Sequence, residues 1–105
     1  MTINRRAKGA RGELELADEL RKHGWEGRRG QQFSGGTDSP DVVTNLPWHF
    51  EVKRVEAGNP YKWLKQAQRD CGKKVPVVAH RKTREEWVVI LTLDDFLNLY
   101  LCKAE

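Results

Sequence analysis

Three charged residues near the middle of the chain are of the types that bind metal ions and phosphate. Asp41 opens a short apolar run, and Glu51 and Lys53 lie in a second apolar run after a turn at residues 45–47. Because side chains alternate between the two faces of a strand, Glu51 and Lys53 share one face. If the two runs pair, Asp41 reaches the same face. The pattern therefore predicts two carboxylates and an ammonium group in one small volume.

Such a group of side chains suits a hard divalent cation. Mg²⁺ takes oxygen ligands, usually one or two carboxylates, and leaves other positions to water and substrate phosphate. The carbonyl of Val52, between the two strand side chains, is a further candidate ligand. The ion lowers the pKa of a bound water, and Lys53 can orient that water or neutralise the oxyanion. An ordinary hairpin with a surface Glu–Lys pair has the same spacing, so the pattern needs support from the rest of the chain.

A third acid is expected on the first helix, which should span residues 9–23 and end at Gly24. The apolar stripe of this helix consists of Leu16, Ala17 and Leu20, and its polar side of Glu15, Asp18, Glu19 and Lys22. Glu13 falls within the apolar stripe, where a carboxylate requires a partner such as a metal or a base. A position in the first helical turn, where the helix dipole favours a carboxylate, is the alternative. We expect Glu13 to join Asp41 and Glu51, because this helix should pack on their sheet.

The remaining elements alternate between short strands and helices. Strands are expected at 25–33, 42–43, 48–54, 75–80 and 87–91, with helices at 60–71, capped by Asn59, and from Thr92 onwards. This order predicts a mixed α/β or α+β sandwich around a central sheet of about five strands. Strand 75–80 should run parallel to strand 48–54 through a right-handed helical crossover. Leu93 and Phe96 of the last helix should pack in the core, and the residues that can offer apolar area to a second copy are Leu97, Tyr100 and Leu101.

Composition indicates one soluble domain over residues 1–105, with residues 1–8 as a loose basic arm. No apolar run is long enough to span a membrane, and no apolar segment follows the basic N-terminus as in a secretory signal. Cys71 and Cys102 lack metal-type spacing, so free thiols in a reducing cytoplasm are expected. None of the three histidines has ligand spacing to another, and His49 should be a partly exposed strand residue beside Glu51.

The net charge of +4 comes with clustered basic residues. Such clusters favour a polyanionic partner, most simply nucleic acid, although a solvated surface has the same composition. The candidate DNA-binding residues are Arg5, Arg6, Lys8, Arg11, Arg28, Arg29, Lys62 and Arg69. The polar loop 34–39 lies next to Asp41, so Ser34 and Arg29 are candidates for contact with a substrate.

In this order and spacing, the residues resemble the PD-(D/E)xK nuclease superfamily, and more closely its archaeal-type and phage Holliday junction resolvases. The resemblance extends from Lys8 to about Leu91. The segments that carry it are KGARGELEL with Glu13, Arg29, Ser34-Gly35, PDVV with Asp41, FEVKR with Glu51 and Lys53, Tyr61 with Gln66-Ala67, and VPVVAHR. These resolvases usually have arginine directly after the first glutamate, where this chain has Leu14.

The resemblance implies a restriction-endonuclease-like core and a role for each matching residue. Glu13, Asp41, Glu51 and the Val52 carbonyl would bind Mg²⁺, which Mn²⁺ can replace, and Lys53 would be the catalytic lysine. Ser34 and Arg29 would assist cleavage, and Gln66 would lie at the edge of the site. The family works as a homodimer that nicks two opposed strands of a four-way DNA junction, and the compact chain suits a phage gene. The alternatives are a related nuclease acting on forks or duplexes, and a non-catalytic nucleic-acid-binding module.

Overall fold

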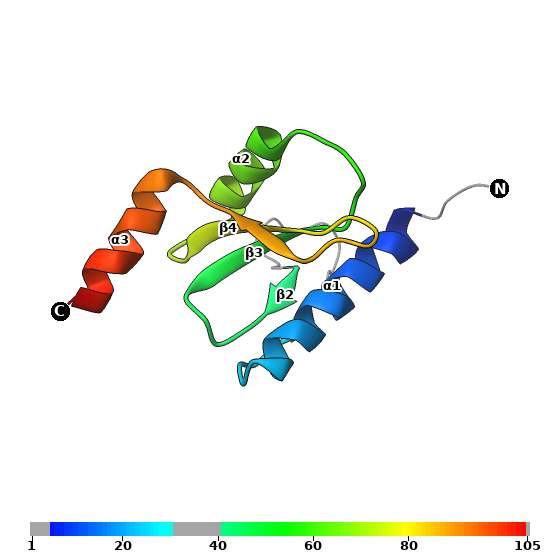
Figure 1. The fold of residues 1–105 in the computed structure, drawn as a ribbon, viewed down its shortest axis with the longest axis horizontal. Coiled ribbons are helices and arrows are strands. Elements are labelled where there is room, and N and C mark those ends of the chain that lie inside the picture. Colours follow the sequence, from blue (N-terminus) through cyan, green and yellow to red (C-terminus); the bar gives the residue numbers. More distant parts are fainter. Residues whose placement is uncertain (1–4, 31–40, 105) are drawn as a thin grey trace.

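The computed structural model describes residues 5–30 and 41–104, with side chains described for residues 10–30 and 41–99. Three helices and five strands follow one another in the described part, in the order expected (Figure 1). They are α1 (Arg5–Lys22), β1 (Arg28–Arg29), β2 (Val42–Val43), β3 (Trp48–Lys53), α2 (Pro60–Asp70), β4 (Val75–His80), β5 (Val88–Ile90) and α3 (Leu93–Ala104).

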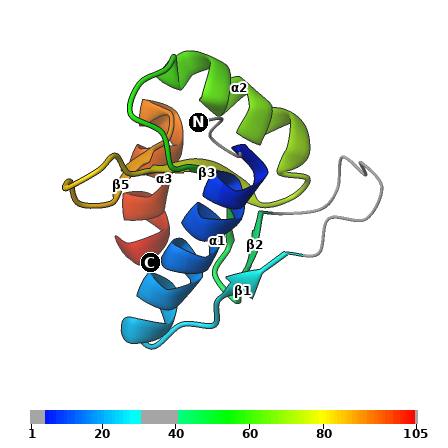
Figure 2. The ribbon, with the colours of Figure 1, turned by 90° about the vertical axis from the view of Figure 1, so that its right-hand side faces the viewer.

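The main sheet has the order β3-β4-β5. Strands β3 and β4 are parallel, with Glu51 opposite Val78 and Lys53 opposite His80, as predicted, and β5 is antiparallel to β4. Helix α2 provides the crossover between the parallel strands. Helices α1 and α2 lie on opposite sides of β3 (Figure 2). The mixed α+β class is confirmed, and β3 is an edge strand of the main sheet that lies between α1 and α2.

The expected single sheet of about five strands is wrong. Strands β1 and β2 form a separate antiparallel pair, and the main sheet has three strands. The physical reason lies at Val52, whose N–H is donated to the carboxylate of Asp41 and not to a backbone carbonyl of β2. A side chain thus replaces the hydrogen-bond ladder that would have joined β2 to β3. The predicted strand pairing between β2 and β3 is therefore absent from the described residues, and a hydrogen bond to the Asp41 side chain stands in its place.

The main core lies between α1 and the sheet. Its buried residues are Leu16, Ala17, Val42, Leu46, Phe50, Val77 and Ala79. Since β3 alternates, Phe50 faces this core while His49 and Glu51 face α2. On that second side Ala67 and Val78 are fully buried. Helix α2 therefore covers the polar face of β3 and shields it from solvent.

The helix ends follow from local sequence signals. Helix α1 ends as predicted: Gly24 takes a φ of 89°, and the N–H of Trp25 is donated to the carbonyl of Leu20. It begins at Arg5, so residues 5–8 belong to the helix and not to the predicted loose arm. Helix α2 begins as predicted, with the Asn59 side chain accepting from two backbone N–H groups. None of the described helices has the length and apolarity needed to cross a membrane.

Helix α3 departs most from expectation. Its cap is as predicted, because the Asp95 N–H is donated to the Thr92 hydroxyl at 3.1 Å. The core packing expected of Leu93 and Phe96 is wrong, since these side chains are 69% and 59% exposed. Figure 1 shows the reason: α3 projects away from the sheet and covers neither of its faces.

Candidate active site

The end of β3 brings the predicted residues of the two apolar runs together. Asp41 lies just before β2, and its Oδ2 accepts the N–H of Val52 at 2.8 Å. In a strand the N–H and C=O of one residue point to the same edge. The carbonyl of Val52 therefore lies on the edge that faces Asp41, as expected of a shared ligand group.

Glu51, Lys53 and Gln66 form the second part of the site. The Nζ of Lys53 lies 3.7 Å from Oε1 of Glu51 and donates a hydrogen bond to Oε1 of Gln66 at 3.3 Å. Gln66 is on α2, which packs on the polar face of β3. This contact holds the lysine between a strand carboxylate and a helix amide, and it places Gln66 at the edge of the site.

Glu13 reaches the site from α1. It is only 8% exposed, and its Oε2 accepts a hydrogen bond from Nε of Arg29 at 2.6 Å. Arg29, on β1, was expected to contact substrate, and its described partner is this carboxylate. An electrostatic interaction also links Glu13 with Asp41. The charge of Asp41 acts on Glu13 from α1 and on Glu51 from β3, so Asp41 lies within electrostatic reach of both acids.

All three acids, Glu13, Asp41 and Glu51, have raised pKa values. Burial, with a smaller contribution from the charge of Asp41, raises the pKa of Glu51 to about 7, against the opposing effect of Lys53. Burial also raises the pKa of Asp41, against the effect of the Val52 hydrogen bond. The pKa of Glu13 is raised by burial and, in part, by Asp41, while Arg29 opposes the rise. Positive charge brought to this place would be strongly stabilised.

The donor atoms fit a hard cation in kind. They are carboxylate oxygens and one backbone carbonyl, which are the ligands that Mg²⁺ takes. Among the described residues, however, no three histidine, cysteine, aspartate or glutamate side chains stand in an arrangement that could hold a metal ion. Internal contacts explain this, since Glu13 is held by Arg29 and Glu51 lies beside Lys53. Side-chain rotations would have to bring the carboxylates together around an ion.

Sequence reasoning missed a fourth carboxylate, Asp70. Its negative charge contributes to raising the pKa of Asp41 and of Glu51. The available signal was its spacing of four residues from Gln66, which puts both on one face of α2. His49 also differs from expectation. It is 6% exposed, not partly exposed, because α2 covers this side of β3, and burial lowers its pKa.

The structure describes the side chains of only some of the basic residues expected to bind DNA. Lys62 and Arg69 are exposed and lie four and three residues from Gln66, on the flank of α2 that borders the site. Arg11 and Arg28 are exposed as well. Ser34 lies outside the described residues, as do the side chains of Arg5, Arg6 and Lys8.

A cavity of about 790 Å³ lies apart from these acids. Its walls include Trp25, Trp48 and Trp87 together with Glu85 and Glu86. None of the residues predicted to act on phosphate lines it. Acidic side chains outnumber basic ones in its lining, which disfavours a polyanion, so this cavity is not part of the candidate site.

Comparison with known proteins adds one finding. Residues 4–103 match the model of a family described as “Phage putative PDDEXK endonuclease”. No curated protein matches the chain. The matched region includes α1, the sheet and α2, and so all the elements that carry the acids and the lysine described above.

Proposed function

The chain belongs to the phage PD-(D/E)xK endonuclease family, and from this premise we propose that it is a divalent-metal-dependent endonuclease that nicks branched DNA, such as four-way junctions. The observation that carries the metal-dependent chemistry is the convergence of Glu13, Asp41, Glu51 and Lys53 at the end of β3. Carboxylates facing a DNA phosphate would repel it unless a cation intervened. A module that only bound DNA would have no need of them.

Glu13, Asp41, Glu51 and the Val52 carbonyl would hold Mg²⁺, or Mn²⁺ in its place. When bound, the cation supplies positive charge that lowers the pKa of water and offsets the charge of the phosphate. Lys53 supplies a positive group beside the acids, and its contact with Gln66 holds the ammonium there. There it orients the attacking water and neutralises the charge that develops on the phosphate oxygens. Ser34 and Arg29 are proposed to assist through contacts with the substrate.

The substrate and the assembly rest on the resemblance to junction resolvases. Two opposed strands of a junction require two active sites, and we propose that a second copy of the chain supplies the other. The exposed apolar side of α3 supports this, because Leu93, Phe96 and Leu97 are each at least 50% exposed. The cytoplasm of the host is the proposed compartment, which agrees with the free thiol of Cys71.

Cleavage of matched substrates tests the function. Labelled four-way junction, fork and linear duplex of the same sequence are incubated with the protein, with Mg²⁺ or with EDTA. We expect symmetric nicks in the junction with Mg²⁺ and none with EDTA. Preferential cutting of linear duplex would contradict the junction substrate, and salt-sensitive binding without any cutting would contradict catalysis.

Variants assign the chemistry. Asp41→Asn and Lys53→Ala should each lower the cleavage rate at least about 100-fold, the scale on which electrostatic groups act, while DNA binding persists. Asp94→Asn, an exposed acid at the start of α3, and Lys82→Ala, an exposed lysine after β4, are the matched controls. Equal loss of binding and of folding in the Asp41 and Lys53 variants would mean that these side chains are structural.

A further inference from the structure

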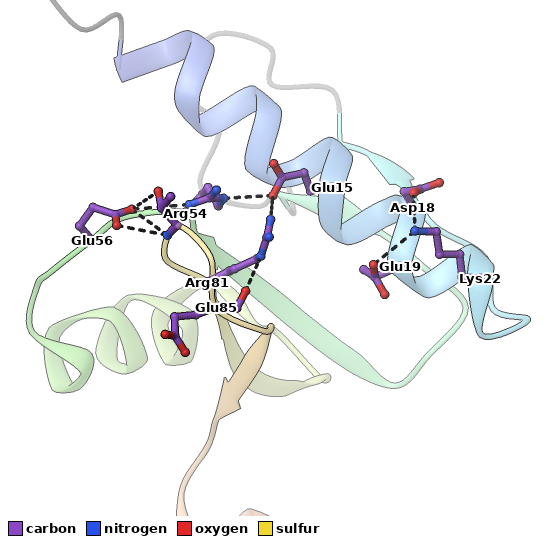
Figure 3. Close-up of polar contacts among 9 residues, drawn as sticks. Glu15, Asp18, Glu19, Lys22, Arg54, Glu56, Arg81 and Glu85 are labelled. Carbon is purple, nitrogen blue, oxygen red and sulfur yellow. Dashed lines mark hydrogen bonds and ion pairs between the residues drawn. The ribbon is translucent and has the colours of Figure 1, made fainter.

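A partly buried ion-pair cluster connects α1 to the end of β3, directly beside the candidate site. Nε of Arg54 donates to Oε2 of Glu15 at 3.0 Å, and an Nη of Arg81 donates to the same oxygen at 3.1 Å (Figure 3). Glu15 is on α1, Arg54 directly follows β3, and Arg81 directly follows β4. The sequence pattern put Glu15 on the polar side of α1 with Asp18, but in the structure its carboxylate contacts the arginines that follow two strands. Glu15, Arg54 and Arg81 are called the Glu15 cluster below.

Further contacts fix both arginines of the Glu15 cluster. The guanidinium of Arg54 also lies 3.6 Å from the carboxylate of Glu56, which accepts the N–H and the hydroxyl of Thr83. Nε of Arg81 donates to the backbone carbonyl of Glu85 at 2.7 Å. The Arg54 side chain is only 14% exposed, so solvent and salt screen its ion pairs less than those of an exposed arginine. The Glu15 cluster thus connects α1 with the residues that follow β3 and β4.

Close backbone packing between α1 and the end of β3 accompanies the Glu15 cluster. A Cβ added at Gly12 would lie 2.6 Å from the Cβ of Arg54, so α1 rests directly on the residue after β3. Gly12 immediately precedes Glu13, and Arg54 immediately follows Lys53. The two residues that touch are therefore the chain neighbours of two site residues from different elements.

We propose that Glu15, Arg54 and Arg81 are positioning residues that set the place of Glu13 relative to Asp41, Glu51 and Lys53, and thereby the affinity of the site for a divalent cation. Glu13 is the one acid of the three that α1 supplies. A shift of α1 on the sheet would move it away from the other two. The inference rests on the proposed function and deepens it, because it names what assembles the ion site.

The same helix offers a matched contrast. Asp18, one turn further along α1, pairs with Lys22 (Figure 3) and with Arg21. These side chains are more than half exposed. Both partners are on α1 itself, so this pair stiffens the helix without attaching it to the sheet. Removal of the Asp18 charge should leave Glu13 where it is.

The test compares Glu15→Gln with Asp18→Asn. Calorimetric titration of the DNA-free protein with Mn²⁺ gives the dissociation constant, and a junction-cleavage assay over a range of Mn²⁺ concentrations gives the rate at saturation. For Glu15→Gln we expect the dissociation constant to rise about 10-fold, as is typical when a group that orients metal ligands is removed. The cleavage rate at saturating Mn²⁺ should change little, because the ligands themselves remain. Asp18→Asn should match the unaltered protein in both measurements.

A purely structural cluster would give a different result. Glu15→Gln would then lower the melting temperature and leave the Mn²⁺ dissociation constant unchanged, which overturns the positioning role. Should Glu15→Gln fail to fold, Arg81→Lys keeps the charge and the Glu15–Arg54 contact, and it should raise the dissociation constant by a smaller factor. No change in that variant would also overturn the inference. If the unaltered protein neither binds Mn²⁺ nor cuts DNA, the proposed function falls and the positioning role with it.

Discussion

Glu51 is the residue at which stability and chemistry conflict. It is 5% exposed, and burial together with the charge of Asp41 raises its pKa to about 7, against an ordinary value of 4.5. Between these two values the folded state holds a proton that the unfolded state has released. Folding is therefore favoured most at low pH, and this contribution is lost as the pH rises through 7. The difference amounts to about 3 kcal/mol.

Glu51→Gln should therefore stabilise the metal-free protein at high pH. We expect the free energy of unfolding to rise by about 1–3 kcal/mol at pH 8 and by much less at pH 5, since glutamine carries no charge at either pH. Urea denaturation in EDTA at both pH values measures this. Glu85→Gln, at an exposed position, is the control and should behave alike at both. An equal effect of Glu51→Gln at pH 5 and pH 8 would contradict a raised pKa.

Helix α2 joins the site to the surface that would meet DNA. Its capped start fixes the helix, Gln66 contacts Lys53, and Lys62 and Arg69 lie exposed on the same flank. Long basic side chains beside a phosphate-cutting site are suited to contact the neighbouring phosphates. We propose that α2 aligns contacts to the DNA backbone with the reacting phosphate.

Substitution on this flank should change the salt dependence of DNA binding. Lys62→Gln and Arg69→Gln should each reduce the slope of log K against log salt by about one, because each removes one phosphate contact. Fluorescence anisotropy with a labelled junction in EDTA measures the slope without cutting. Lys82→Gln, equally exposed but after β4, is the control and should leave the slope unchanged. An unchanged slope in the α2 variants would remove both residues from the interface.

At the scale of the whole molecule, exposed apolar side chains are unevenly distributed. Among the described residues, most of the large exposed hydrophobics lie at the start of α2, on β5 and on α3; they are Tyr61, Val88, Val89, Leu93, Phe96 and Leu97. A groove of about 650 Å³ runs between α2, β5 and the start of α3. Exposed apolar area of this kind often marks an interaction site. We propose a second copy as the partner, since a two-fold interface pairs a patch with itself.

The paired substitution Phe96→Glu with Leu97→Glu should shift the protein towards monomer. Two charges on the apolar side of α3 would be buried without partners in a dimer, which is strongly unfavourable. Sedimentation velocity over a range of concentrations gives the oligomeric state. Leu14→Glu, at a residue 56% exposed on α1, is the control. A monomeric unaltered protein at all concentrations would contradict the proposed dimer, and paired nicking of the junction should then be absent as well.

Local patterns in the sequence were sufficient for most elements and for the candidate residues. Asn59 and Gly24 mark helix ends through hydrogen bonds within a few residues, which depend little on the rest of the fold. Period-2 alternation put Glu51 and Lys53 on one face of β3, and the helical crossover dictated its parallel pairing with β4. The matched family model agrees with the resemblance to PD-(D/E)xK nucleases.

Tertiary structure alone decided how these pieces meet. Contacts between residues distant in sequence decide four features of the structure. Asp41 replaces a strand ladder, and Glu15 turns to the sheet. His49 is buried, and α3 stands apart from the sheet. A periodic pattern reports which side of an element is apolar, because that depends on the element itself. It does not report which neighbour lies on that side, because hydrogen bonds and ion pairs are formed only once the chain has packed.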